Sequence, residues 1–419
     1  MSRRLVISLV ACLGIVSPGN AQYLVLPMDG AQANHLRSYG LAYWTLQRGD
    51  QVEWLLNYRA GSFLLPDSDP VRREAALRGV TVEPLSRAGL VAIRAEIESS
   101  NMESVILEKA PRIAVYTPPS ARPWDDAVTL ALTYAGIEYE KVWDPEVLAD
   151  GLLRYDWLHL HHEDFTGQFS KFYLTYAGSA WLQEAVFRDR RVAASHGFPD
   201  APALKKAVAE KIREYVEGGG FMFAMCTATE TIDLALAALG VDIAAAYADG
   251  DGIDPDAQVR LKWGRTLAFE DAELFSNPSL SAFSDIDGHL VNTPMRQPLG
   301  TFQLFDFSAK IDPVASMLTQ NHERVIPDFY GLTTSFRRTR LKPSVTVLAE
   351  EPGAPWVKYI HGNYAKGTWT FLGGHDPEDP QHVIGDPPTD LDLYPHSPGY
   401  RLILNNVLFP AAKKKHLKT

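Results

Sequence analysis

Cysteine is nearly absent from this sequence, and the motifs of several common enzyme classes are missing. Only two cysteines occur in 419 residues. The sequence has no Cys-x-x-Cys pair, no His-Glu-x-x-His segment, no Walker A loop and no dinucleotide-binding Gly-x-Gly-x-x-Gly. These absences argue against a disulfide framework and against nucleotide-driven chemistry, and they leave the chain without the common zinc-site spacings.

Positive charge is also in short supply. The chain has 40 basic and 51 acidic side chains and a formal net charge of −11, so we expect no nucleic-acid partner. The lysines cluster only in the tail 411–419, which is typical of a solvated terminus. The sequence is 46% hydrophobic and 22% charged, as in globular proteins, and its length predicts two domains or one domain with an insertion.

Long hydrophobic runs are missing after the first 21 residues. Arg3 and Arg4 precede the apolar stretch 5–16, and small residues end at Ala21, a pattern that predicts a signal peptide over 1–21 and a periplasmic or secreted protein. Alternatively, residues 9–12 resemble a lipoprotein box with a lipidated Cys12. No other run reaches the roughly 18 apolar residues of a membrane span, so we expect none.

Strand-like and helix-like segments alternate along the rest of the chain, which predicts an α/β fold with a doubly wound, mostly parallel, flavodoxin-like sheet. We expect an N-terminal α/β region over 22–110 and a larger α/β domain over 111–410. The rhythm is lost between residues 241 and 340, which we interpret as an inserted, lid-like segment.

Cys226 is the best single candidate for chemistry. It follows the apolar run 221–225 and precedes a helix, with Thr227 and Glu230 at capping-box spacing. A nucleophile on such a turn faces a cleft, and the helix N-terminus would lower the thiol pKa below about 8.5 and hold an oxyanion near Thr227. The alternative is a buried cysteine that only fills space.

His375 is the second candidate, because it follows an apolar run and a Gly-Gly pair, with Asp376 and Glu378 close behind. Ligands of doubly wound sheets lie beyond the carboxyl ends of the strands. Cys226, His375 and the cluster 161–164 all follow predicted strands, so we expect one edge of the sheet to gather them.

The cluster His161, His162, Glu163 and Asp164 has the chemistry of a polar, substrate-binding wall. With His375, the two histidines could also bind a divalent metal, although adjacent residues on a strand face opposite sides. A further acidic loop contains Asp249, Asp251, Asp254 and Asp256, but it lacks the spacing of a calcium loop, and we interpret it as a solvated turn.

Residues 112–408 resemble a class I glutamine amidotransferase-like domain, and more closely its trehalose-utilisation (ThuA-like) relatives. The segments that carry the resemblance are Gly-Gly-Gly-Phe-Met-Phe-Ala-Met-Cys at 218–226, Gly-Thr-Trp-Thr-Phe-Leu-Gly-Gly-His-Asp at 367–376 and Pro-Gly-Tyr-Arg-Leu-Ile-Leu-Asn-Asn-Val-Leu-Phe-Pro at 398–410. Nearly the whole chain is similar to exported bacterial proteins labelled asparagine synthetase B, through the segments 54–59, 159–168 and 318–322.

The amidotransferase resemblance implies a nucleophilic Cys226, a proton-shuttling His375, and Asp376 or Glu378 as the third member of a triad. Two features depart from the pattern: Glu378 stands three residues after His375 rather than two, and the cluster 161–164 replaces the Gly-Gly oxyanion loop. The chain also lacks the Ser-Gly-Gly-x-Asp-Ser loop and the N-terminal cysteine of asparagine synthetases, since the expected mature chain begins at Gln22.

Two functions are therefore compatible with the sequence. The first is a cysteine-dependent hydrolase that acts on an amide or related bond of a small molecule and requires no cofactor. The second is a non-catalytic or metal-assisted protein of the ThuA-like type that binds a carbohydrate or another small molecule. The sequence indicates neither protein partners nor the substrate.

Overall fold

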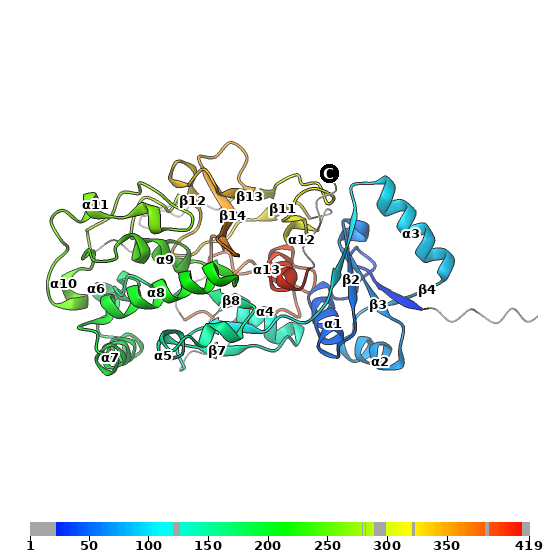
Figure 1. The fold of residues 1–419 in the computed structure, drawn as a ribbon, viewed down its shortest axis with the longest axis horizontal. Coiled ribbons are helices and arrows are strands. Elements are labelled where there is room, and N and C mark those ends of the chain that lie inside the picture. Colours follow the sequence, from blue (N-terminus) through cyan, green and yellow to red (C-terminus); the bar gives the residue numbers. More distant parts are fainter. Residues whose placement is uncertain are drawn as a thin grey trace, which may run out of the picture.

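The computed structural model describes residues 22–119, 126–278, 280, 282–288, 299–320, 323–381 and 385–412 (Figure 1). The predicted signal peptide, with Cys12, and the lysines of the basic tail lie outside these residues. The described chain contains two β-sheets with helices packed on them, an α/β architecture. Within it, no helix combines the length and the apolar character needed to cross a membrane.

Residues 22–110 form a five-stranded sheet in the order β4-β1-β3-β2-β5, and its strand pairs are antiparallel. The strands are β1 (Tyr23–Leu26), β2 (Val52–Leu56), β3 (Ser62–Pro66), β4 (Glu83–Leu85) and β5 (Glu103–Leu107), and the helices are α1 (His35–Gln47), α2 (Asp69–Arg78) and α3 (Arg87–Ser99). The prediction of a parallel sheet is wrong for this region. The turn Tyr58–Ala60 joins β2 to β3, and it is far shorter than the crossover that parallel neighbours require.

The second sheet is mixed. Its order is β11-β10-β13-β14-β15-β9-β8-β6-β7, with β12 paired to β14. The strands are β6 (Ile113–Tyr116), β7 (Glu140–Val142), β8 (Trp157–Leu160), β9 (Phe221–Met225), β10 (Thr301–Leu304), β11 (Val325–Pro327), β12 (Phe336–Arg337), β13 (Thr346–Glu350), β14 (Trp356–Tyr364) and β15 (Gly367–Leu372). The pairs from β15 through β9, β8 and β6 to β7 are parallel, whereas the pairs from β15 to β11, and β12 with β14, are antiparallel. The expected parallel arrangement therefore holds for only half of this sheet.

Helices cover both faces of the parallel half. The helices after residue 111 are α4 (Ala127–Ala135), α5 (Asp144–Leu148), α6 (Tyr173–Tyr176), α7 (Ala180–Ser195), α8 (Ala201–Gly218), α9 (Thr227–Ala237), α10 (Ala246–Asp249), α11 (Ala257–Arg260), α12 (Ala315–Leu318) and α13 (Pro398–Leu408). Trp157 and Phe223 lie in one core with α4 and α13, while Leu158 and Ala224 lie in the other core with α8 and α9. This alternation follows from the two-residue period of a strand.

The described residues of the segment 241–340 are packed into the domain. Its strands β10, β11 and β12 extend the second sheet, and two buried carboxylates of α9 hold its loops. Asp233 accepts hydrogen bonds from the backbone N–H groups of residues 267, 268 and 269, and Glu230 accepts them from the hydroxyls of Ser284 and Thr333. The lid-like part of our interpretation does not fit these contacts, whereas the insertion stays a prediction.

Burial raises the pKa of Glu230 to about 7, although the hydrogen bonds from Ser284 and Thr333 lower it in part. Between pH 4.5 and 7 the unfolded chain releases this proton while the folded chain keeps it, so stability falls as the pH rises and the penalty is constant above pH 7. We expect Glu230→Gln to gain stability over wild type across this window, up to about 3 kcal/mol. Urea unfolding at pH 4.5 and 8 measures it. The exposed Glu217→Gln serves as the control, and an equal gain at both pH values would contradict the prediction.

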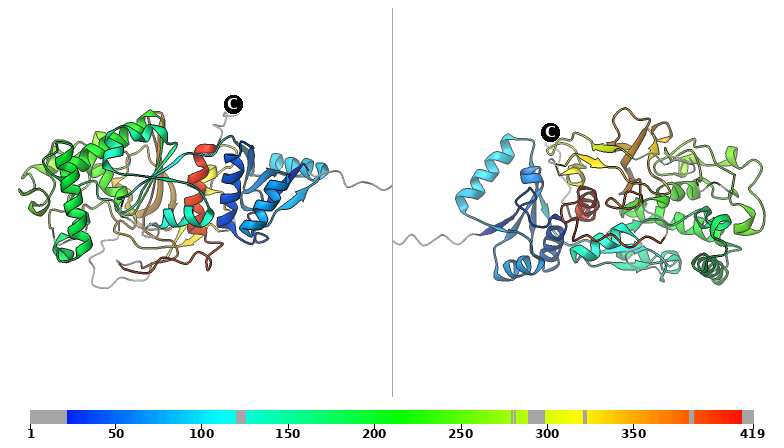
Figure 2. Two further views of the ribbon diagram at one scale, coloured as in Figure 1. Left: turned by 90° about the horizontal axis from the view of Figure 1, so that it is seen from below. Right: turned by 180° about the vertical axis from the view of Figure 1, so that it is seen from behind.

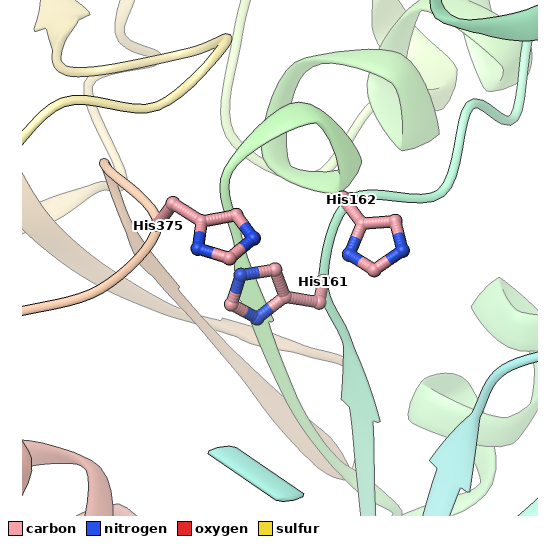
Figure 3. Close-up of side chains that lie close together, drawn as sticks. All are labelled: His161, His162 and His375. Atoms are coloured by element: carbon pink, nitrogen blue, oxygen red, sulfur yellow. The ribbon is translucent and has the colours of Figure 1, made fainter. Parts of the chain in front are cut away.

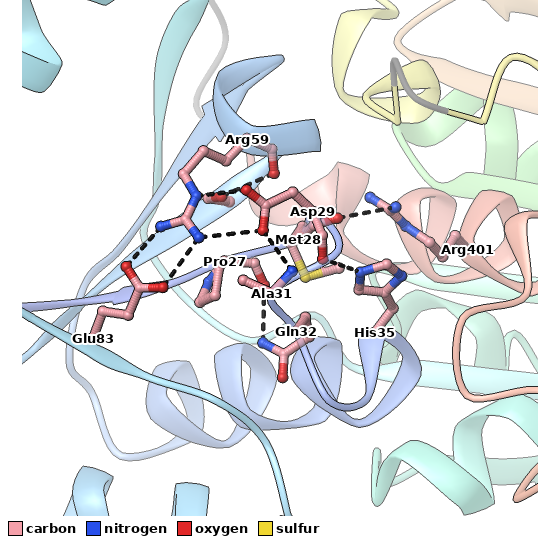
Figure 4. Close-up of polar contacts among 10 residues, drawn as sticks. Pro27, Met28, Asp29, Ala31, Gln32, His35, Arg59, Glu83 and Arg401 are labelled. Carbon is pink, nitrogen blue, oxygen red and sulfur yellow. Dashed lines mark hydrogen bonds and ion pairs between the residues drawn. The ribbon is translucent and has the colours of Figure 1, made fainter.

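The N-terminal region is joined to the larger domain through α1, which packs against α4 and α13 (Figure 2). Arg401 of α13 is fully buried, and its guanidinium donates hydrogen bonds to the carbonyls of Ala60 at 2.7 Å and Met28 at 3.4 Å (Figure 4). Nearby, Arg59 bridges the carboxylates of Asp29 and Glu83. Arg401, within the segment 398–410, thus ties α13 to the N-terminal region.

Candidate functional site

The three sequence clusters meet at one edge of the second sheet. β8 is parallel to β9, with Leu160 opposite Ala224, and β9 is parallel to β15, with Met225 opposite Leu372. The residues that follow these strands therefore emerge side by side. The backbone N–H of Cys226 donates to the carbonyl of Gly374 at 3.1 Å, which ties the second cluster to the third.

Three histidines converge there (Figure 3). One ring nitrogen from each of His161, His162 and His375 lies within 4.8 Å of the other two. The rings of His161 and His375 meet edge to face with centroids 4.4 Å apart. Because β8 ends at Leu160, the two neighbouring histidines are not bound to the alternation of a strand, and both reach the same cluster.

A carboxylate lies behind His161. Asp126 is the N-cap of α4, and its Oδ1 accepts the N–H groups of Val128 at 2.6 Å and Thr129 at 3.1 Å. The same oxygen lies 3.3 Å from Nδ1 of His161. The other nitrogen of His161, Nε2, is buried and has no hydrogen-bond partner. An imidazole held by a carboxylate at one nitrogen presents the other nitrogen as a ligand.

Asp126 also faces His159, whose Nε2 lies 3.1 Å from Oδ2. Burial by itself would raise the pKa of Asp126, but His159 and His161 hold it well below the usual range. Sequence reasoning missed both Asp126 and His159. His159 stands in β8 two residues before His161, and that spacing is the one signal that could have found it.

Glu163 lies beside His162, with Oε1 3.9 Å from Nε2. Burial raises the pKa of Glu163 to about 7, although His162 and Lys205 oppose the shift. Asp164 does not join this wall. Its Oδ1 accepts the N–H and hydroxyl of Thr166, and its Oδ2 accepts the N–H groups of Gln168 and Ser170. Asp164 thus shapes the following loop, and its contact with a substrate stays a prediction.

Cys226 occupies a strained turn, with φ 50° and ψ −135°. Such a conformation is costly for a residue other than glycine and is common where a nucleophile is presented. Cys226 is itself the N-cap of α9, and the side chain of Glu230 is directed to Ser284 and Thr333, so the expected capping box of Thr227 with Glu230 does not form.

The sulfur of Cys226 is covered. Its contacts are the N–H of Leu332 at 3.3 Å and the hydroxyl of Thr227 at 3.7 Å, and only 2% of the residue is exposed. A Cβ added at Gly331 would lie 3.1 Å from the sulfur, so only glycine allows this loop to approach so closely. Burial raises the pKa of Cys226, and the nearby donors do not overcome it, which corrects the expected lowered pKa.

The predicted third triad member is also placed differently. Asp376 accepts hydrogen bonds from the hydroxyls of Tyr400 and Thr389, both at 2.8 Å, and from the N–H of Glu378 at 2.9 Å. Glu378 pairs with Ser397, and burial raises its pKa. Asp376 therefore anchors the C-terminal loop, whereas Asp126 and Glu163 are carboxylates that lie next to the histidines.

We expect the buried thiol to react slowly. In a chain that starts at Gln22, Cys226 is the only cysteine. Iodoacetamide should label it about 100-fold more slowly in the folded chain than in guanidinium, because the loop at Gly331 and Leu332 must open first. Mass spectrometry over time measures both rates, and Cys226→Ser controls for reaction elsewhere. Equal rates in the two states would contradict the covered position.

The acidic loop contains a second, more open group of possible ligands. Carboxylate oxygens of Asp242, Asp249 and Asp251 lie within 4.8 Å of one another. Asp254 and Asp256 are instead paired with Arg260. Asp251 is exposed, whereas Asp242 and Asp249 are half-buried, so the expected solvated turn describes only part of this group.

No protein-family model matches the chain, and no curated protein does. Among solved structures, cytoplasmic protein STM3548 from Salmonella typhimurium is similar at 10% identity and a TM-score of 0.34, over 72% of this chain and 100% of that one. Cytoplasmic protein STM1381 from Salmonella typhimurium LT2 is similar at 13% identity and a TM-score of 0.35, with the same coverage. Likenesses at these levels assign neither a family nor an activity to the chain.

Proposed function

We propose that this protein is a metal-dependent, small-molecule-binding protein whose centre is formed by His161, His162 and His375, and that it hydrolyses a bond of its ligand there. The observation that carries the proposal is the buried Nε2 of His161, which has no hydrogen-bond partner and belongs to a cluster of three imidazoles. An empty buried acceptor is costly, and a cation relieves that cost.

The donor set fits a divalent transition metal. Three neutral imidazoles suit zinc, copper, iron or nickel, and three protein ligands leave a position open for water or ligand. An ion bound there would polarise an oxygen of the ligand and lower the pKa of a bound water to about 7. Asp126 lies behind His161 and orients its ring, and Glu163 lies beside His162 as a nearby carboxylate.

The experiment is metal analysis of the purified chain after dialysis against zinc, manganese or iron(II). We expect a bound ion in wild type, and its affinity should fall at least about 100-fold in His162→Ala and His375→Ala, since each variant removes one ligand. The exposed His196→Ala is the matched control and should bind as wild type does. Wild type that binds no ion, and whose Tm does not change when these metals are added, would overturn the proposal.

A second candidate function is cysteine-dependent hydrolysis of an amide or related bond, and the strained turn at Cys226 favours it. The sequence resemblance suggests an exported, amidotransferase-like (ThuA-like) protein with a doubly wound flavodoxin-like core. Cysteine-dependent hydrolysis is the function expected of such a protein. Cys226 would attack and His375 would carry the proton, once the loop over the sulfur has moved.

Two variants separate the candidates. With a panel of chromogenic amides, esters and glycosides, Cys226→Ser should abolish turnover under the cysteine mechanism and leave it within about twofold under the metal mechanism. His162→Ala should abolish turnover under the metal mechanism and leave it within about twofold under the cysteine mechanism. Loss in both variants would indicate that the thiol and the metal centre act together.

A further inference from the structure

A second group of metal-ligating atoms lies directly beneath the three histidines. Asp126, His159 and His161 are all buried. Nε2 of His159 lies 3.1 Å from Oδ2 of Asp126 and 3.3 Å from Nδ1 of His161, and that Nδ1 lies 3.3 Å from Oδ1 of Asp126. Ligands of a four-coordinate zinc ion, with bonds of 2.0–2.1 Å, stand about 3.3 Å apart. Each pair of these side chains already has that spacing, His159 with Oδ2 and His161 with Oδ1 of Asp126, and one ligand atom from each of the three lies within 4.8 Å of the others.

The hydrogen bonds of His159 indicate which of its atoms is the ligand. Nδ1 lies 3.1 Å from the carbonyl oxygen of Phe223, and because this oxygen can only accept, Nδ1 carries a hydrogen. In the neutral ring, Nε2 is then a lone pair that faces a carboxylate and a second imidazole. The N–H groups of Val128 and Thr129 occupy Oδ1 of Asp126, which leaves Oδ2 toward His159. Acceptors that face one another in a buried space are unfavourable, and a proton or a metal ion between them removes that cost.

We propose that Asp126, His159 and His161 form a second, buried metal position, so that the protein holds two divalent ions joined through the ring of His161. This inference rests on the proposed function for its first ion, which the Nε2 atom of His161 binds with His162 and His375. Nδ1 of the same ring binds the second ion, and the proton that it loses passes to solvent.

The charges support this arrangement. A dication in a buried position needs compensating negative charge, because an unpaired charge there is strongly unfavourable. Asp126 supplies one negative charge, and the imidazolate of His161 supplies the other. His159 keeps its hydrogen bond to Phe223. The imidazolate is shared by the two ions, so these two negative charges offset half of the charge of the two dications.

The test counts the ions in the full chain after dialysis against zinc. We expect two per chain in wild type. His159→Gln should lose the second ion and retain the first, and His162→Ala should weaken binding of the first ion. With copper(II), the spins of two ions bridged by one imidazole couple, so wild type should give a reduced electron paramagnetic resonance signal per copper, and His159→Gln should restore it.

The outcomes separate the two proposals. One ion in wild type, retained by His159→Gln and lost from His162→Ala, would overturn the second position and keep the proposed function. Asp126 and His159 would then only orient His161 through hydrogen bonds. No ion at all would overturn both proposals. The wild-type count and signal need no variant, so they decide the question even if His159→Gln fails to fold.

Discussion

Lys358→Met is expected to lower the free energy of unfolding by about 3–5 kcal/mol. Lys358 of β14 is buried, and its ammonium group pairs with Asp328 at 2.5 Å and donates hydrogen bonds to the carbonyls of Phe329 at 2.7 Å and Thr334 at 2.9 Å. Methionine fills nearly the same volume but leaves a buried carboxylate and two carbonyls without their partner. That loss exceeds any gain from removing a buried charge.

The same change should expose the thiol. Asp328, Phe329 and Thr334 belong to the loop that covers Cys226, so without Lys358 this loop loses the anchor at both of its ends. We expect iodoacetamide to label Cys226 at least about tenfold faster than in wild type under native conditions. Lys366→Met, at an exposed position of the same hairpin, is the matched control. Unchanged stability and labelling in Lys358→Met would contradict the role of the ammonium group.

Gly40→Ala is expected to destabilise the protein by about 3 kcal/mol, at the upper end of the overpacking range. Gly40 lies in α1 where this helix crosses α4, and an added Cβ would stand 1.7 Å from the carbonyl oxygen of Ala135. Because that atom belongs to the backbone, the helices must separate. Alanine favours a helix over glycine by about 1 kcal/mol, so helix propensity opposes the clash without cancelling it.

Gly218→Ala provides the comparison, since Gly218 is also helical and nothing lies within 4 Å of a Cβ added there. That variant should be neutral or stabilised by up to about 1 kcal/mol. Denaturant unfolding of both variants measures the difference. A Gly40→Ala variant as stable as Gly218→Ala would show that α1 and α4 are not closely packed.

Part of the site could be predicted from the sequence. Apolar runs that end at residues 160, 225 and 372, each followed by polar residues, predict parallel strands with a common edge, and the structure has them as neighbours. The positions of His161, His162, Cys226 and His375 at this edge follow from that pairing. The pattern could not distinguish which of them face one another, because each follows the end of its strand, where alternation no longer applies.

The surroundings of these residues could not be predicted from the sequence. Asp126 reaches His161 from the start of α4, and nothing in the sequence relates the two across 35 positions. The loop over Cys226 comes from the segment 328–334, about a hundred residues away, and its burial reverses the pKa shift that the helix N-terminus alone predicts. The carboxylate of Asp376, which we expected beside His375 as a third triad member, instead accepts hydrogen bonds from the hydroxyls of Tyr400 and Thr389.

The sequence by itself determined the α/β class of this protein and the convergence of its chemical groups on one sheet edge, because hydrophobic periodicity and strand ends are local properties of the chain. The tertiary structure decided the antiparallel N-terminal sheet, the cover over the thiol and the carboxylate behind His161. Each of these depends on contacts between distant segments, and the balance of burial and hydrogen bonding at such contacts is set only when the chain has folded.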